Sequence, residues 1–199
     1  SASWTDWSDL QADLIDGYSF PTTTNVGDGR VFSLGVSGSW RPLRALELEA
    51  SAYLNNSEVT QPYGILIASY DSRGEGGTVE PARTNRLPNI ADAMAHFSFN
   101  WGTPVGDNFD FDLSGYARYV GKSVLGVGPL LGRLQGDYLD TGIEAQLSRG
   151  NVRYSLSLTN LLNSTGNRFT LGSPFQIRDG DQITPLKPRS IRLGAQIDF

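Results

Sequence analysis

Charged side chains in this sequence are confined to every second position of its extended segments. In the last segment, from Ile191 to Phe199, every odd position is apolar and every even position is polar or glycine. A period of two is that of a β-strand, whose successive side chains point to opposite faces. We find no convincing 3.6-residue pattern of useful length, so the sequence predicts an all-β fold.

About eight segments show this alternation, and in nearly all of them the apolar row contains no charge. Asp6 is the main exception, near the end of the least regular segment. A half-buried sheet of a soluble protein would alternate in the same way, so the pattern alone does not identify the environment. The expected strands are Trp4 to Leu14, Phe32 to Trp40, Leu46 to Leu54, Ala91 to Trp101, Phe109 to Tyr119, Leu139 to Leu147, Val152 to Thr159 and Ile191 to Phe199.

Strand length favours a membrane sheet. Most expected strands have about ten residues, which is the length that crosses a bilayer at a tilt of about 45°. Strands of soluble domains more often have about 5–6 residues. No stretch approaches the roughly 18 consecutive apolar residues of a membrane helix. The sequence therefore predicts antiparallel strands of a transmembrane β-barrel.

The expected connections alternate between short and long. Arg41 to Arg44, Gly102 to Asn108 and Arg149-Gly150 are short. Short periplasmic turns and long extracellular loops are typical of outer-membrane barrels. A chain that ends at Phe199 after a long connection would then end on the periplasmic side. The long connections, expected to be extracellular, are Ile15 to Gly29, Val59 to Asn89, Gly121 to Gly136 and Leu162 to Arg189.

Aromatic side chains of the apolar rows support this orientation. Given the short turns on the periplasmic side, three of the four tryptophans would collect at that side. An interfacial girdle requires such a rim, whereas a soluble sandwich core gives no reason for it. The expected girdle consists of Trp4, Trp40, Trp101, Phe109 and Phe199.

Composition excludes several kinds of partner and site. A net charge of -5 argues against nucleic acid as a partner. The absence of cysteine excludes disulfides and thiolate metal sites. The sequence opens Ser1-Ala2-Ser3, with neither a methionine nor a signal peptide, so we expect a fragment or a processed chain.

Several short motifs resemble the C-terminal part of a TonB-dependent outer-membrane receptor. Leu87-Pro88-Asn89 would open a strand, Tyr116 to Gly121 would close one, and Asn160-Leu161-Leu162-Asn163 would end another. The final Ile197-Asp198-Phe199 resembles the terminal aromatic strand of that family, and Tyr18 to Trp40 resembles a preceding hairpin. In this order and spacing the motifs are fairly specific.

The resemblance implies that residues 1–199 are the last part of a plugged barrel of about 22 strands. The N-terminal plug domain and the earlier strands would be absent from the chain. The implied function is import of a scarce nutrient, such as a ferric siderophore or a sugar, across the outer membrane. Energy would come from a TonB-type protein. The other implied partners are the plug and strands of the same receptor, outer-membrane lipid and the small-molecule nutrient, without a cofactor.

Two alternatives remain open from the sequence. A complete eight-stranded barrel with a structural or adhesive role would pair the first strand with the last, since eight is an allowed strand number. A membrane lipid hydrolase would use His96 and Ser98, two residues apart on one row, as base and nucleophile. Such enzymes present the pair to lipid, whereas this pair falls on the polar row. We therefore expect no catalytic residues and no enzyme.

Acidic and glycine-rich motifs do not predict a metal or phosphate site. Asp110 to Gly115 begins like a calcium loop, but it lies inside a strand and Gly121 replaces the closing glutamate. Gly126, Gly128 and Gly132 match no phosphate-binding spacing. The segment Asp179-Gly180-Asp181 is better interpreted as a polar loop tip.

The charged side chains of the inward rows predict the solvated, mixed-charge wall of a large barrel. A closed eight-strand barrel would have to pair these charges densely in its interior. The row residues are Glu47, Glu49, Asp92, Asp110, Asp112, Arg118, Asp140, Glu144, Arg153, Arg192 and Asp198.

Aromatic and arginine side chains in the long loops suit an anionic iron chelate or a sugar-like ligand. They suit a solvated loop nearly as well. The candidate ligand-binding residues are Tyr63, Tyr70, Arg73, Arg168, Phe169 and Phe175.

Overall fold

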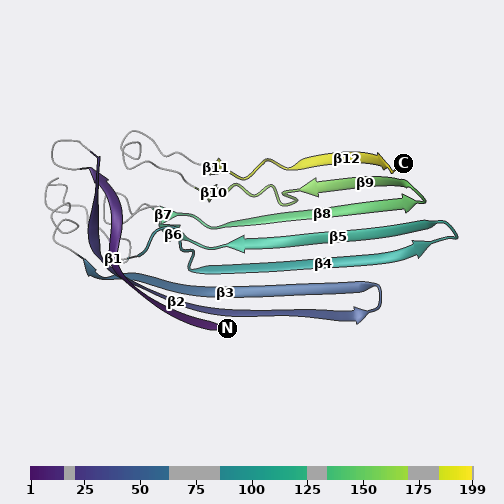
Figure 1. Ribbon diagram of the computed structural model, residues 1–199. Helices are drawn as coiled ribbons and strands as arrows, with labels where there is room; N and C mark the ends of the chain where they lie inside the picture. Colours follow the sequence, from purple (N-terminus) through teal and green to yellow (C-terminus); the bar gives the residue numbers. More distant parts are fainter. Residues whose placement is uncertain (16–20, 63–85, 125–133, 170–183, 199) are drawn as a thin grey trace.

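The computed structural model describes residues 1–15, 21–62, 86–124, 134–169 and 184–198. Eight strands form one antiparallel sheet in the order β1-β2-β3-β4-β5-β8-β9-β12 (Figure 1). No helix of these residues is long and apolar enough to span a membrane. The strands of the sheet are β1 (Ala2–Ile15), β2 (Pro21–Leu43), β3 (Leu46–Pro62), β4 (Ala93–Val105), β5 (Phe109–Val120), β8 (Tyr138–Arg149), β9 (Val152–Thr159) and β12 (Ser190–Ile197).

The all-β prediction and all eight expected strands are confirmed. The turns that join β2 to β3, β4 to β5 and β8 to β9 lie at one end of the sheet, together with the C-terminus (Figure 1). We call this the turn end, and the opposite end the loop end. Gly106 and Gly150 have φ values of +62° and +55° in two of these turns. Glycine adopts such left-handed conformations without steric cost.

Two small sheets lie outside the main one. β6 (Ser123–Val124) pairs with β7 (Leu134–Gln135), and β10 (Asn167–Phe169) pairs with β11 (Thr184–Pro185). Both fall within connections that we expected to be long, Gly121 to Gly136 and Leu162 to Arg189. These two connections are therefore partly ordered by strand pairing close to the ends of the main strands.

The predicted long loop from Ile15 to Gly29 is wrong. β1 and β2 remain paired as far as Ile15 and Pro21, so most of this segment belongs to the two strands. β3 likewise continues past Val59 to Pro62. Threonines at 22–24 favour a strand because their branched side chains suit a pleated surface. The alternation ceases there although the hydrogen-bond ladder continues.

The sheet has one apolar face and one polar face. On the apolar face, one row of cross-strand partners runs without a break through Trp40, Leu48, Phe99, Gly115, Ile143, Leu158 and Ile191. On the polar face, the corresponding row runs through Glu47, Asn100, Ser114, Glu144, Ser157 and Arg192. Along these rows the register therefore keeps the apolar and polar residues of each strand on separate faces, as expected.

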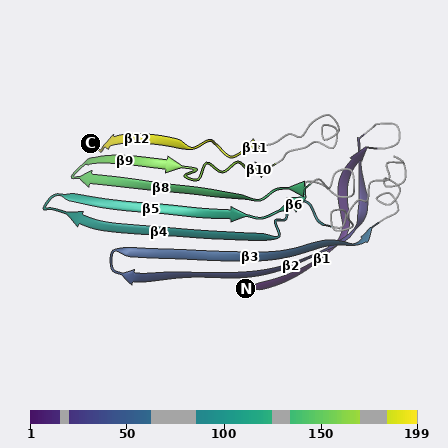
Figure 2. The ribbon, with the colours of Figure 1, turned by 180° about the vertical axis from the view of Figure 1, so that it is seen from behind.

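The two edges of the sheet lie far apart. β1 is one edge strand and β12 the other, and both views show the sheet as an open layer with these strands on opposite sides (Figures 1 and 2). Within the described sheet, β1 pairs with β2 and β12 pairs with β9. The alternative of a closed eight-stranded barrel, which requires β1 to pair with β12, is therefore not the fold of this chain.

A small hydrophobic core anchors the loop end. Leu10, Val59 and Leu87 are buried together, and Val31 and Ile90 pack against them. Leu10 joins this core because β1 contains a bulge between Trp7 and Leu10, where Asp9 has a φ of +56°. The bulge moves Leu10 to the polar-face side, since an odd register shift exchanges the faces of a strand.

Backbone hydrogen bonds hold the segment that leads into β4 against the neighbouring strands. The Asn55 N–H donates to the Asp92 carbonyl at 2.9 Å, and the Asn89 N–H donates to the Val124 carbonyl at 2.7 Å. The Leu87-Pro88-Asn89 motif therefore has a structural cause: Leu87 fills the core, and Asn89 adopts a φ of +59°.

Candidate functional site: the two faces of the sheet

The polar face has an uneven distribution of charge. Acidic side chains occupy β3, β5 and β8, whereas the basic side chains Arg153 and Arg192 lie on β9 and β12. Arg118 is the exception within the acidic part, and it lies directly opposite Asp140 in the register. The acidic members are Glu47, Glu49, Asp110, Asp112, Asp140 and Glu144.

Few of these charges form close ion pairs. Arg41 binds Glu47 with an Nη2 to Oε1 distance of 2.9 Å, and Arg86 lies 3.8 Å from Asp92 near the loop end. The Ser98 hydroxyl donates to Glu49 at 3.4 Å. Most of the expected inward charges are thus arranged as the exposed wall that the sequence predicted, and not as a buried network.

A cleft of about 430 Å³ lies at the turn end, among residues of β3, β4, β5 and β8. Its lining is largely polar, so it would hold water or a polar segment more readily than an apolar ligand. The lining residues are Arg41, Arg44, Ala45, Leu46, Glu47, Asn100, Trp101, Gly102, Asp112, Leu113, Ser114 and Gln146.

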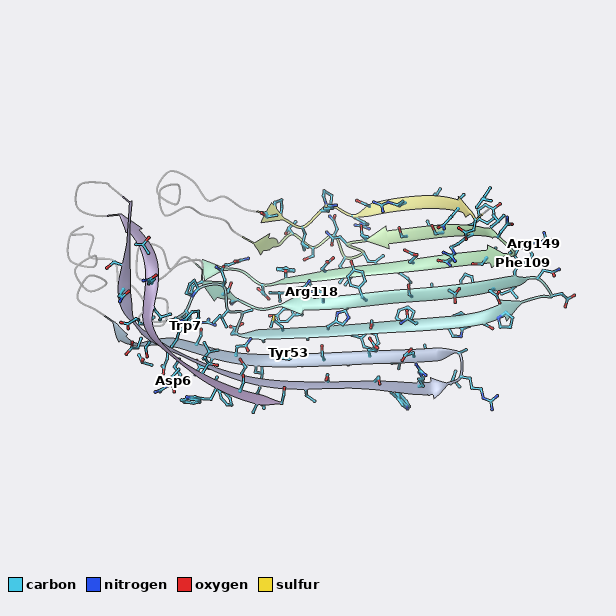
Figure 3. All side chains as sticks on the ribbon, viewed as in Figure 1. Asp6, Trp7, Tyr53, Phe109, Arg118 and Arg149 are labelled. Carbon is cyan, nitrogen blue, oxygen red and sulfur yellow. The ribbon has the colours of Figure 1, made fainter. Side chains whose placement is uncertain are left out.

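The structure brings together only three of the five side chains of the predicted aromatic rim. Trp40, Trp101 and Phe109 lie on the apolar face toward the turn end, and Figure 3 shows Phe109 there. Trp4 does not, because its cross-strand partner is Phe32, eight residues before Trp40 in β2. That offset is about 26 Å along a strand. Phe199 lies outside the described residues.

Trp4 instead marks the opposite border of the apolar face. Immediately beyond it, Arg30 lies between Asp6 and Glu58, with N–O distances of 3.2 and 3.6 Å. The Arg30 guanidinium also lies 4.8 Å from the centre of the Trp4 ring. The apolar face therefore ends in a charged row at the loop end, which explains why Asp6 breaks the sequence rule.

The Asp6 carboxylate is stabilised in its charged form. A hydrogen bond from the Trp4 indole N–H, 2.9 Å long, is the main reason that the pKa of Asp6 is lowered. A hydrogen bond from the Arg30 guanidinium acts in the same direction. Both effects are weakened by solvent, because Asp6 is exposed.

Neither catalytic nor metal-binding alternatives gain support. His96 and Ser98 lie on the polar face of β4, opposite Arg118 and Tyr116, and the Ser98 hydroxyl donates to Glu49. A serine nucleophile would instead donate to its base. Asp110 and Asp112 lie within β5 as expected. No group of three or more histidine, aspartate and glutamate side chains among the described residues is placed to hold a metal ion.

The candidate ligand-binding residues are not brought together by the described part of the chain. Tyr63, Tyr70, Arg73 and Phe175 lie outside the described residues. Arg168 and Phe169 belong to β10, but their side chains are also outside the described part. The residues that sequence reasoning missed are those of the loop-end core, for which Leu87 in the Leu87-Pro88-Asn89 motif was a signal.

The chain is similar in structure to three solved outer-membrane receptors. The ferric yersiniabactin uptake receptor FyuA from Yersinia pestis superposes with a TM-score of 0.71 at 15% identity, over 98% of this chain and 26% of the receptor. The ferric-catecholate import receptor Fiu from E. coli K12 gives 0.65 at 16% identity, over 98% and 24%. BauA, the ferric preacinetobactin receptor from Acinetobacter baumannii, gives 0.61 at 15% identity, over 100% and 26%.

The chain spans about a quarter of the length of each of these receptors. No family model matches the sequence, and the comparison with curated proteins finds none that is similar in sequence. The resemblance expected from the motifs is thus confirmed at the level of structure. The chain has the fold of part of the β-barrel of a TonB-dependent outer-membrane receptor.

Proposed function

We propose that this chain forms part of the wall of an outer-membrane barrel that imports a scarce nutrient. The observation that supports this best is the unbroken row of apolar partners across seven strands, from Trp40 to Ile191. In β5 the apolar row from Phe109 to Tyr119 extends about 33 Å along the strand, or about 23–27 Å across a bilayer at a tilt of about 35–45°. That height matches the lipid-facing band of outer-membrane barrels.

In this proposal the polar face lines the interior, where a large barrel holds water and a plug. The exposed charges of β3 to β12 suit that setting, because the charged side chains can remain hydrated. The plug and the remaining strands would come from the rest of the same receptor. A TonB-type protein would supply the energy for import through that plug.

The substrate class that we propose is a ferric chelate. The three structural neighbours are described as receptors for ferric yersiniabactin, ferric catecholate and ferric preacinetobactin. The aromatic and arginine residues proposed to contact the ligand are Tyr63, Tyr70, Arg73, Arg168, Phe169 and Phe175. The sequence argument for a sugar-like ligand has no comparable support.

Uptake of radioactive iron tests the function. The complete receptor would be produced in cells that lack their own ferric-chelate receptors, and offered ferric catecholates, hydroxamates and mixed chelates separately. We expect iron to accumulate with one class only, and uptake to stop when the TonB-type protein is deleted. Uptake that persists without that protein would contradict active import. Uptake of a sugar without iron would contradict the substrate class.

Orientation is tested by surface labelling. The chain has no cysteine, so single cysteines can be introduced for labelling. Asp107 lies in the turn between β4 and β5, and Leu162, which is 65% exposed, lies at the loop end. A maleimide that cannot cross the outer membrane should label Leu162→Cys, but not Asp107→Cys, in intact cells. Permeabilised cells provide the control, since both positions should then react; the reverse pattern would invert the proposed topology.

A further inference from the structure

The apolar face contains a shallow groove on β5, β8, β9 and β12. Its volume is about 360 Å³. The floor is low because Ala145 lies between the larger Leu113 and Leu156 in the register. The apolar side chains that line the groove are Phe111, Ala145, Leu147, Tyr154, Leu156 and Leu193, with the backbone of Gly194 beside them.

An arginine lies at the turn end of this groove. Arg149 occupies the same row of β8 as Ala145 and Leu147, and its cross-strand partner is Val152. The Arg149 guanidinium lies 5.1 Å from the centre of the Phe109 ring, and Figure 3 shows the two side chains together at the turn end. Among the described residues Arg149 has no ion-pair partner. Arg149 is thus a charged residue in the otherwise uncharged row of β8 that contains Ala145 and Leu147.

An arginine at the end of an apolar, lipid-facing surface would be stabilised by an anion that lies at the same depth in the membrane. Charged side chains on the lipid side of a membrane protein are costly unless they reach the interface. Arg149 can do so, because it is next to the β8–β9 turn and extends beyond the apolar rows. Stacking on Phe109 holds the guanidinium against the sheet. No described residue accepts a hydrogen bond from its guanidinium, whose N–H groups suit phosphate oxygens.

We propose that the groove and Arg149 together bind one anionic glycerophospholipid. One acyl chain would lie along Phe111, Leu147 and Leu156, and the phosphate would bind Arg149. A single groove with a single cation suits a lipid with one phosphate better than lipid A, which has several phosphates and acyl chains. The inference rests on the proposed function, since it requires the apolar face to lie in the membrane.

Native mass spectrometry of the complete, delipidated receptor tests the site. Phosphatidylglycerol, phosphatidylcholine and lipid A would be titrated separately. The site variants are Arg149→Gln and Ala145→Phe, which fills the groove. Arg44→Gln and Ala50→Phe are matched controls, because Arg44 lies at another turn and Ala50 lies on the apolar face of β3, outside the groove. Arg149→Lys retains the charge and should retain most of the binding.

We expect Arg149→Gln to weaken phosphatidylglycerol binding about fivefold, the factor for one basic side chain near an anionic lipid. Its binding of phosphatidylcholine should fall less, because choline offsets the charge of that lipid's phosphate, whereas Ala145→Phe should weaken both lipids equally. Equal binding by wild type and Arg149→Gln, or tighter binding of lipid A, would overturn the inference. The heat-modifiable gel band and iron uptake report on the barrel and its function separately. A negative lipid result with both intact would therefore refute the lipid site alone.

Discussion

Asn160 shows how one residue can end a strand and hold a neighbouring segment. It is only 3% exposed, and its φ of +52° is one that asparagine tolerates better than most residues. Its side-chain amide donates to the carbonyls of Ser164 and Lys187 at 3.0 and 2.9 Å, and its oxygen accepts from the Ser164 N–H. The Asn160-Leu161-Leu162-Asn163 motif thus stops β9 and fixes the entry into β12. Its role in this chain is structural.

The assignment of faces predicts opposite outcomes at two adjacent residues. Leu156 is on the apolar face near the middle of β9, and Ser157 is on the polar face. Leu156→Arg should reduce barrel stability by about 2–4 kcal/mol or prevent insertion, because it places a charge in hydrocarbon. Ser157→Arg should be tolerated much better. Denaturant unfolding of the receptor in lipid vesicles measures both, and equal effects would contradict the assignment.

The Asp6 carboxylate predicts a loss of stability in acid. Because its pKa is lowered in the folded state by Trp4 and Arg30, it favours folding above its unfolded pKa. This contribution is lost as the pH falls below about 4, the pKa of a free aspartate, and through the lower pKa of the folded state. Asp6→Asn should therefore flatten the pH dependence of unfolding in that range. Asp107→Asn, in an exposed turn, is the control, and an equal flattening there would exclude a specific role for Asp6.

At the scale of elements, the bulge in β1 and Gly29 in β2 together make room for the loop-end core. A Cβ added at Gly29 would lie 2.6 Å from a Leu10 methyl and 3.2 Å from a Leu87 methyl. Gly38, in the same strand, has nothing within 4 Å of that position. Gly29→Val should thus cost about 1–3 kcal/mol through overpacking. Gly38→Val should be neutral or stabilising. The urea midpoints of the two variants measure this difference, and equal midpoints would contradict the role of Gly29.

Alternation in the sequence predicted the strands where the two faces meet different environments, as in β5, β8 and β9. It failed for the outer parts of β2 and β3, where most residues of both rows are polar. The residues near Thr23 and Asp28 resemble a loop for that reason, although they are in a ladder. The alternation also missed the bulge at Asp9, and without that register shift Leu10 could not be assigned to a core. Alternation also does not show where a residue lies along the barrel axis, and for this reason the sequence analysis assigned Trp4 to the wrong border of the apolar face.

At the scale of the whole molecule, the open edges are the main consequence of the fold. An edge strand in hydrocarbon would leave its N–H and C=O groups unpaired, at a cost of several kcal/mol each. Both β1 and β12 lie at such edges in the described sheet. If the apolar face lies in the membrane, as proposed, we expect these strands to pair with strands supplied by residues other than 1–199.

This predicts that residues 1–199 do not form a stable barrel alone. Produced by themselves and refolded in detergent, they should aggregate and give no heat-modifiable band on a gel. Co-refolding with the remaining part of the receptor should restore the band, because it supplies partners for β1 and β12. A detergent-stable monomer in which β1 and β12 are hydrogen-bonded to each other would contradict this prediction.

The separation of the two faces also limits how this chain can change in length. Within the apolar rows, inserting or deleting one residue would send every later side chain of that strand to the opposite face, arginines into lipid and leucines into water. Beyond the charged row of Asp6, Arg30 and Glu58, the pairing of β1 with β2 shifts between Trp7 and Leu10 and shifts back between Leu10 and Gln11, so an irregular register is tolerated there. Single-residue insertions and epitope tags should consequently be accepted in the turns, or in β1 on the loop-end side of Asp6. They should be rejected in β2 between Phe32 and Trp40.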